Sequence, residues 1–320
     1  MRADWRTALR GAIATVIVVL VVRFVAEKWD EISVSAAALR PSWSGLLSAS
    51  ACVFAGYAVL IASWRLLLRT WNSPLPVLDA ARIWFVSSLG KYVPGKVWAI
   101  GAMAVLAKEA GASPLAATGS SVIMALVNVA AGFVVVALAG AGDVLAAFPA
   151  LRVGAWITLA VTLVGLAYGP VLLVWMVRQG TRLFRRTMPD MPKISRTTLL
   201  LVFAANIFAW IAYGVGFGIF WSALLGHGGG ISTAALAVYT ASYLLGYLAL
   251  VVPGGLGVRE TALTGLLISL RLATPADAAL LAAASRIWLT VLEIVPGLAF
   301  LPGTSLRRRT PTSPPDGPPA

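Results

Sequence analysis

Long uncharged apolar runs limit what this chain can fold into more than any other feature of its sequence. Such runs occupy residues 41–64, 115–142, 153–177 and 199–225. Each exceeds the roughly 20 apolar residues that a helix needs to cross the hydrocarbon core of a bilayer. Of the 320 residues, 59% are hydrophobic and only 12% are charged, so we expect no folded domain outside the membrane. The sequence predicts an all-α polytopic membrane protein.

The placement of charge predicts the topology. The formal net charge is +13, and cations cluster before the first apolar stretch, between 178 and 198, and after residue 304. Lys and Arg beside spans mark the cytoplasmic side, where they also suit anionic headgroups. The loop at 27–31 contains acids and is expected outside. We therefore predict a multi-pass protein of the cell (inner) membrane with both termini cytoplasmic, and no nucleic-acid partner.

Six full spans are expected, at about 9–26, 43–68, 115–139, 153–177, 199–225 and 278–301. Two further apolar stretches, 80–98 and 236–270, are interrupted by helix-breaking residues, which are Pro94, Gly95, Pro253, Gly254, Gly255 and Gly257. Proline removes a backbone donor, and backbone freed at membrane depth must be satisfied by protein or a water-filled cavity. Both stretches are thus predicted to be broken re-entrant hairpins. For the first, a pair of amphipathic surface helices is the alternative.

The predicted elements repeat with inverted topology. Helix, helix, broken hairpin and helix occur twice, starting inside the first time and outside the second. LGKYVPG at 89–95 aligns with LALVVPG at 248–254, and SP at 113–114 aligns with TP at 274–275. We predict one transmembrane domain over 1–303, with repeats at about 9–140 and 153–303, and a disordered cytoplasmic tail over 304–320. In inverted-repeat transporters the substrate binds where broken helices meet near mid-membrane.

Ionisable residues at membrane depth form the candidate substrate-binding site, because each costs about 2.5–3.5 kcal/mol to insert. They are Lys91, Lys96, Arg259, Glu260, Arg286 and Glu293. Arg286 and Glu293 lie two turns apart on one helix face, and Arg259 with Glu260 could pair with either. The surplus of cations, and a half-helix N-terminus after the second break, favour an anionic ligand such as phosphate. A purely structural ion network is the alternative.

Enzymatic and metal chemistry find little support in the sequence. Cys52 and His227 are the single cysteine and histidine, and no nucleophile, histidine and carboxylate form a catalytic pattern. We therefore expect no catalytic residue, no metal and no cofactor. Asn128 and Asn206, together with Tyr213, Tyr239, Tyr243 and Tyr247, are predicted to form hydrogen bonds between helices.

Three motifs resemble the transmembrane region of lysylphosphatidylglycerol synthases and related flippase-like membrane proteins. They are VPGGLGVRE at 252–260, SRIWL at 285–289 and KYVPGKVW at 91–98. The resemblance implies movement of a lipid with a charged headgroup between leaflets. The 320 residues contain no counterpart of the soluble aminoacyl-transferring domain of the synthases, so synthase activity is not expected of them.

A lipid flippase is the function that we expect. Its cargo would be a phospholipid, an aminoacyl-phospholipid or a polyprenyl-phosphate-linked sugar. The alternatives are a membrane subunit that supports a separate lipid-modifying enzyme or glycosyltransferase, and an integral-membrane transferase. The partners considered are thus an anionic membrane lipid, such an enzyme and a second copy of the chain. No feature separates a proton-coupled carrier from an uncoupled scramblase, and Glu260 is the carboxylate that we expect to couple.

The predicted topology can be tested by cysteine labelling. With Cys52 replaced, Arg182→Cys should be protected from a membrane-impermeant thiol reagent added outside intact cells, because its loop is cytoplasmic. Asp30→Cys should react, because its loop is outside. Labelling after permeabilisation confirms that both thiols are reactive, and the reverse pattern in intact cells would reject the topology.

Overall fold

The computed structural model describes residues 41–92, 97–140, 194–249, Gly255 and 257–300, with scattered helical residues between 153 and 175. Its elements are α3 (Trp43–Thr70), α4 (Val77–Ser88), η1 (Leu89–Tyr92), α5 (Val97–Glu109), α6 (Pro114–Ala139), α9 (Arg196–Leu225), α10 (Thr233–Leu248), α11 (Val258–Ser269) and α12 (Pro275–Ala299). The described residues contain no strand, so the predicted all-α fold is confirmed.

Four described helices, α3, α6, α9 and α12, are long and apolar enough to cross a membrane. They match four of the six predicted spans. Of the other two, the span at 9–26 lies outside the described residues, and the span at 153–177 is described only at scattered positions. The total of six spans therefore stays a prediction.

Side-chain caps set where the long helices begin. Ser42, Ser113, Ser195 and Thr274 each accept a hydrogen bond from a backbone N–H three residues further on. This satisfies one of the N–H groups that a helix start leaves without a partner. The caps place the starts of α9 and α12 three residues earlier than the apolar pattern predicts. Ser113 and Thr274, of the aligned SP and TP pairs, cap the starts of α6 and α12.

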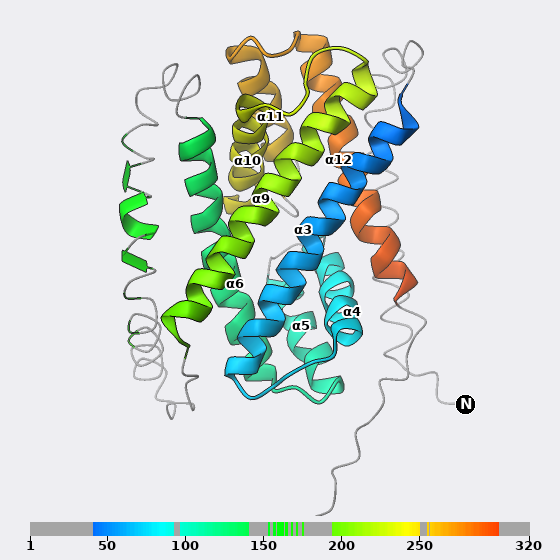
Figure 1. Ribbon diagram of the computed structural model, residues 1–320. Coiled ribbons are helices and arrows are strands. Elements are labelled where there is room, and N and C mark those ends of the chain that lie inside the picture. The colour runs from blue at the N-terminus through cyan, green and yellow to red at the C-terminus, as the bar shows by residue number, and fades with distance from the viewer. Residues whose placement is uncertain are drawn as a thin grey trace, which may run out of the picture.

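Helices α3 and α9 pack side by side through the middle of the fold (Figure 1). Small residues allow their backbones to approach closely, as in many membrane proteins. A Cβ atom added to Gly56 would lie 2.5 Å from Cε1 of Tyr213, and one added to Gly45 would lie 2.6 Å from Cβ of Ala223. This pair of helices therefore forms a tightly packed centre.

The short helices lie at opposite ends of the long ones (Figure 1). Helices α4 and α5 occupy one end, and α10 and α11 occupy the other. They contain 12, 13, 16 and 12 residues, fewer than the roughly 20 that a span requires. Within each pair the two helices pack against each other. Helices α4 and α5 thus lie on either side of the first predicted break, and α10 and α11 lie on either side of the second.

Glycine is required at the second break. Gly255 and Gly257 have φ angles of +67° and +80°, in the region that favours glycine over residues with a side chain. A Cβ atom at Gly255 would also lie 2.6 Å from the carbonyl oxygen of Gly246. Helix α11 begins directly after Gly257. The other predicted hinge residues, Pro94, Gly95, Pro253 and Gly254, lie outside the described residues.

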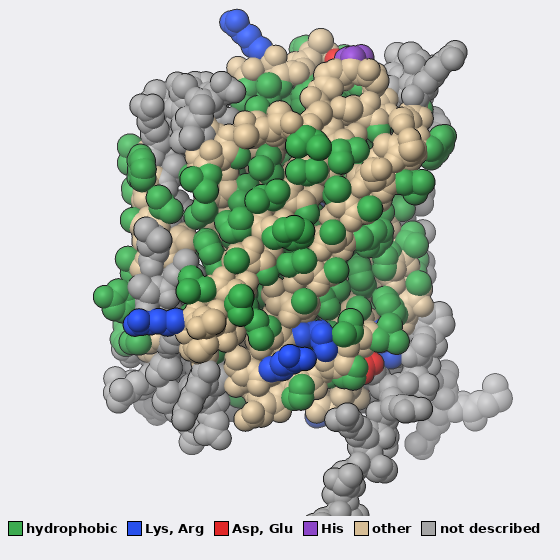
Figure 2. Space-filling view, viewed as in Figure 1, with side chains coloured by type: hydrophobic (Ala, Val, Ile, Leu, Met, Phe, Trp, Pro, Cys, Tyr) green, Lys and Arg blue, Asp and Glu red, His purple; other side chains and the backbone are tan. Residues whose placement is uncertain are grey.

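The outer surface suits a lipid environment. Hydrophobic side chains cover the middle of the face shown in Figure 2, and Lys and Arg side chains lie towards its ends. Large apolar side chains such as Leu47 of α3, Leu126 of α6 and Phe208 of α9 are exposed. Trp64 and Phe217, by contrast, are fully buried. The chain is therefore a multi-pass membrane protein with apolar side chains both inside and out.

Candidate functional site

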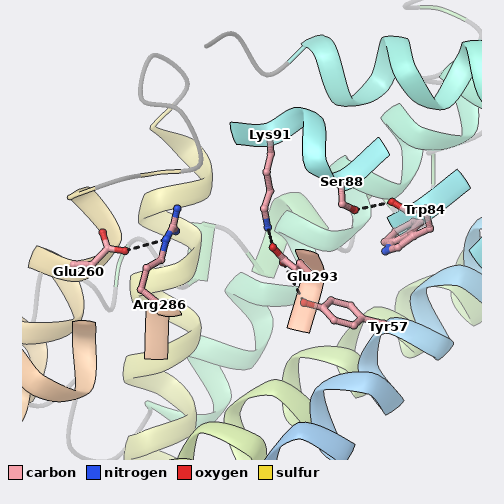
Figure 3. Close-up of polar contacts among 7 residues, drawn as sticks. All are labelled: Tyr57, Trp84, Ser88, Lys91, Glu260, Arg286 and Glu293. Atoms are coloured by element: carbon pink, nitrogen blue, oxygen red, sulfur yellow. Dashed lines mark hydrogen bonds and ion pairs between the residues drawn. The ribbon is translucent and has the colours of Figure 1, made fainter. Parts of the chain in front are cut away.

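Helix α12 carries an acidic and a basic residue that reach both pairs of short helices (Figure 3). Arg286 Nε lies 3.6 Å from Oε1 of Glu260 on α11. Two turns further along, about 10 Å at 1.5 Å per residue, Oε2 of Glu293 forms an ion pair with Nζ of Lys91 on η1. One long helix is therefore linked by charge to both breaks.

Glu293 joins three elements. Its Oε1 accepts a hydrogen bond of 3.1 Å from the hydroxyl of Tyr57 on α3, while Oε2 pairs with Lys91 of η1. The residue is only 7% exposed. One turn further along α12, Gly297 lets η1 approach, since a Cβ atom there would lie 3.0 Å from Cδ2 of Leu89. A buried carboxylate is stable here because both oxygens have partners.

Glu260 holds the start of α11. Its Oε2 accepts a hydrogen bond of 2.7 Å from the backbone N–H of Gly257, and Oε1 faces Arg286. A carboxylate in the first turn satisfies a free N–H group and interacts favourably with the helix dipole. Glu260 therefore stabilises the helix that follows the break.

The side chain of Arg259, from α11, packs against the tyrosines of α10. It is 6% exposed, and its Cζ atom lies 4.6 Å from the ring centroid of Tyr243 and 5.3 Å from that of Tyr239. Both distances are within the range of cation–π attraction. Its Nη2 atom is buried and has no hydrogen-bond partner among the described residues. The guanidinium is thus held in place with donor capacity left over.

The glycine at position 246 makes room for this arginine. A Cβ atom added to Gly246 of α10 would lie 2.8 Å from Cβ of Arg259. A larger residue there would push α11, and the guanidinium with it, away from the tyrosine rings. Gly246 therefore belongs to the site as a spacer.

Cations outnumber carboxylates in this region. Among the described residues, Lys91, Arg259 and Arg286 face Glu260 and Glu293, which leaves an excess of one positive charge. Lys96, the remaining predicted site residue, lies outside the described residues. A buried net charge is costly unless a counter-ion balances it. The arrangement therefore favours an anion.

Sequence reasoning brought together the right charges but missed their aromatic neighbours. The pairing of the Arg259–Glu260 segment with α12 is confirmed through Glu260 and Arg286. Tyr239 and Tyr243 are predicted to form hydrogen bonds between helices. The structure places both rings against Arg259 of α11, and Tyr239 also shares a side-chain hydrogen bond with it. Their spacing of four residues, which puts both on one face of a helix, was an available signal. Tyr57 lies in an apolar run, where no spacing to a second tyrosine marks it as part of the site.

The asparagine prediction is confirmed. Asn128 of α6 donates a hydrogen bond of 2.9 Å from Nδ2 to Oδ1 of Asn206 on α9. Trp210 of α9 donates from Nε1 to the backbone carbonyl of Asn128, also at 2.9 Å. These contacts fix α6 against α9 and so serve the fold.

Together these features define a polytopic helical membrane protein whose charged residues are buried beside two helix breaks. The model of one family, the lysylphosphatidylglycerol synthase TM region, matches residues 8–297. The chain belongs to this family, as the three motifs indicated, and so to membrane proteins of lipid modification or transport. A comparison with curated proteins finds no match to this sequence.

The Lys91–Glu293 pair can be tested by a double-mutant cycle on unfolding free energy in detergent micelles. Lys91→Met and Glu293→Gln should each destabilise the protein. The double variant should lose less than their sum by about 1–2 kcal/mol, because the second change removes an interaction already broken. As a control, Lys91→Met and Asp277→Asn should add, since Asp277 lies at the exposed start of α12. Additivity in the Lys91–Glu293 cycle would show that the pair contributes nothing.

Proposed function

We propose that this protein transports a lipid with an anionic headgroup between the leaflets of the membrane, and that the headgroup binds at Arg259. One observation carries the proposal. A guanidinium that is nine-tenths buried inside a membrane protein keeps a donor with no partner among the described residues. An unpaired buried donor costs about 1–3 kcal/mol, a cost that a ligand accepting this hydrogen bond would remove.

The surroundings of Arg259 favour phosphate in particular. Arg259 is the second residue of α11, where free N–H groups and the helix dipole attract anions. The planar guanidinium fork matches two phosphate oxygens. Lys91, Lys96 and Arg286 supply further positive charge, and Glu260 and Glu293 position them. These six residues form the proposed substrate-binding set.

The arrangement of the short helices supports a path for the headgroup. We infer that α4 with α5, and α10 with α11, are re-entrant hairpins that enter from opposite faces of an inverted repeat. The headgroup would cross between the two breaks while the acyl chains stay in the bilayer. Rocking of one repeat against the other, with hinges at the Pro and Gly residues of the breaks, would give alternating access.

The described cations support the predicted orientation. Arg65 and Arg69 lie near the end of α3, and Arg196 lies at the start of α9. These helix ends lie together, at the end of the protein that α4 and α5 occupy (Figure 1). By the positive-inside rule this end would face the cytoplasm.

The proposed cargo is defined by its phosphate. A phospholipid, an aminoacyl-phospholipid and a polyprenyl-phosphate-linked sugar differ beyond the phosphate but share that group. Arg259 would bind the shared part. Discrimination among these lipids would then depend on the groups next to the phosphate.

Arg259→Gln tests the headgroup site. The purified protein is placed in liposomes, and movement of fluorescent phosphatidylglycerol between leaflets is measured. We expect the variant to lose about 2–5 kcal/mol of headgroup interaction, or roughly 30-fold or more in transport at subsaturating lipid. The reason is that glutamine has no charge and no fork to bind the phosphate.

Arg271→Gln is the matched control, because Arg271 is an exposed arginine just after α11. It should transport like the wild type. Equal insertion and folding of both variants are checked by gel filtration and thermal unfolding. If folded Arg259→Gln transports lipid at the wild-type rate, Arg259 does not bind the headgroup and the proposal is wrong.

A further inference from the structure

We propose that Glu293 is a proton-binding carboxylate and that its protonation releases η1 from α12 during transport. The inference rests on the proposed function and adds its energy source, a proton. From the sequence, Glu260 is expected to couple transport to protons, whereas the structure favours Glu293 for that role. Four observations carry it: the partners of the carboxylate, its burial, its electrostatic neighbours and the contrast with the opposite end of the protein.

Both carboxylate oxygens of Glu293 have partners, and these come from different elements. Tyr57 of α3 donates to Oε1, and Lys91 of η1 pairs with Oε2. The Tyr57 bond survives protonation, because a carbonyl oxygen still accepts it. The ion pair does not, since a neutral acid no longer neutralises the ammonium. Protonation would therefore act selectively on the contact with η1.

The Lys91 side chain can move towards its exposed side once its ion pair with Glu293 is broken. Its side chain is 30% exposed, whereas that of Glu293 is 9% exposed. A partly buried ammonium that loses its ion pair with Glu293 is less stable where it lies, so it would move towards its exposed side and carry η1 away from α12. One proton binds one carboxylate oxygen from water and later returns to water. The step needs no other reactant.

The electrostatic neighbours of Glu293 connect it to the headgroup site. Besides Lys91 and Tyr57, it interacts electrostatically with Tyr213 of α9, Tyr239 and Tyr243 of α10, and Arg259 of α11. Arg286 lies on its own helix, and the ionisable residues of α4, Asp79 and Arg82, lie in the first half of α4, away from η1. An anionic headgroup at Arg259 would repel ionised Glu293 and so favour its protonation. By linkage, protonation would in turn favour headgroup binding.

Glu293 suits this role better than Glu260 does. Glu260 accepts the backbone N–H of Gly257, so its carboxylate is needed to start α11. At the opposite end of the protein, α10 packs on α6, and neither helix carries Lys, Arg, Asp or Glu. The contact between η1 and α12, by contrast, contains an ion pair. The other ion pair of α12, between Arg286 and Glu260, involves a carboxylate that caps α11. The contact between η1 and α12 is therefore the one that protonation would open without disturbing a helix start.

Proton binding is tested without any transport assay. Infrared difference spectra of the full chain in liposomes are recorded as the pH falls. We expect a carboxylic C=O stretching band that Glu293→Gln abolishes and that is retained in Asp277→Asn, which changes the carboxylate in the first turn of the same helix. If no band depends on Glu293 across the range in which the protein stays folded, the proposal is overturned, whether or not the protein moves lipid.

Coupling is tested in the same liposomes with fluorescent phosphatidylglycerol. A pH gradient should change the transport rate of the wild type and of Asp277→Asn, but not that of Glu293→Gln. A wild type that transports equally with and without the gradient would overturn coupling and leave the transport proposal standing. A wild type that moves no lipid under any gradient would overturn the proposed function, and the infrared result would still decide whether Glu293 binds a proton.

A reversible disulfide bond between η1 and α12 tests the release of η1. Leu89 of η1 contacts Gly297 of α12, so Leu89→Cys with Gly297→Cys, in a Cys52→Ser background, should form a disulfide. The oxidised protein should lose transport and regain it on reduction, which also shows that it remained folded. Each single cysteine variant serves as control. Full transport by the fully oxidised double variant would show that η1 need not leave α12.

Discussion

Neutralising charge inside an apolar protein is the constraint on which the rest of this structure depends. Neither water nor lipid can solvate Arg286 or Glu293 at its buried position on α12, so each needs a partner from another element. Glu260 and Lys91 are those partners, and each lies beside a helix break. The breaks expose backbone groups that also need partners, and the capping of α11 by Glu260 meets part of that need. Charge pairing and helix interruption thus stabilise each other.

A chain of buried aromatic rings connects the Tyr57–Glu293 hydrogen bond with Arg259. Tyr57 contacts Tyr213 at 5.8 Å between ring centroids, Tyr213 contacts Trp210 at 6.1 Å, and Trp210 contacts Tyr243 at 5.4 Å. These distances suit edge-to-face packing. The chain of rings extends from the Glu293 partner on α3 to the Arg259 partner on α10. It gives the long helices a firm interior against which the short helices and their charges are placed.

Much of the fold could be predicted because membrane insertion acts on local sequence. Uncharged runs predicted α3, α6 and α9, and an apolar stretch that carries Arg286 and Glu293 predicted α12. The Pro and Gly clusters predicted where shorter helices stop. Pairing across the fold was harder. Glu260 lies in the second broken stretch and Arg286 lies on the helix that follows it, so their contact could be predicted. Lys91 and Glu293 are far apart in sequence, and their pairing depends on how α12 packs against η1.

The aromatic environment of Arg259 illustrates the remaining difficulty. The tyrosines of α10 were visible as polar residues in an apolar helix, but their hydroxyl groups suggested hydrogen bonding to other helices. Only the close approach of α11 at Gly246 turns their ring faces towards the guanidinium. Contacts of this kind depend on a spacer residue and on the path of the chain after the break, neither of which a pattern of hydrophobicity contains.

Solid-state NMR can measure directly whether a lipid phosphate reaches Arg259. The protein, labelled with ¹⁵N-arginine, is placed in phosphatidylglycerol liposomes, and ³¹P recoupling is applied to the guanidinium nitrogens. The account predicts that a buried guanidinium signal, assigned to Arg259 by its loss in Arg259→Gln, is attenuated by a nearby phosphorus atom. Attenuation confined to surface arginines, with the Arg259 signal unaffected by ³¹P, would contradict it.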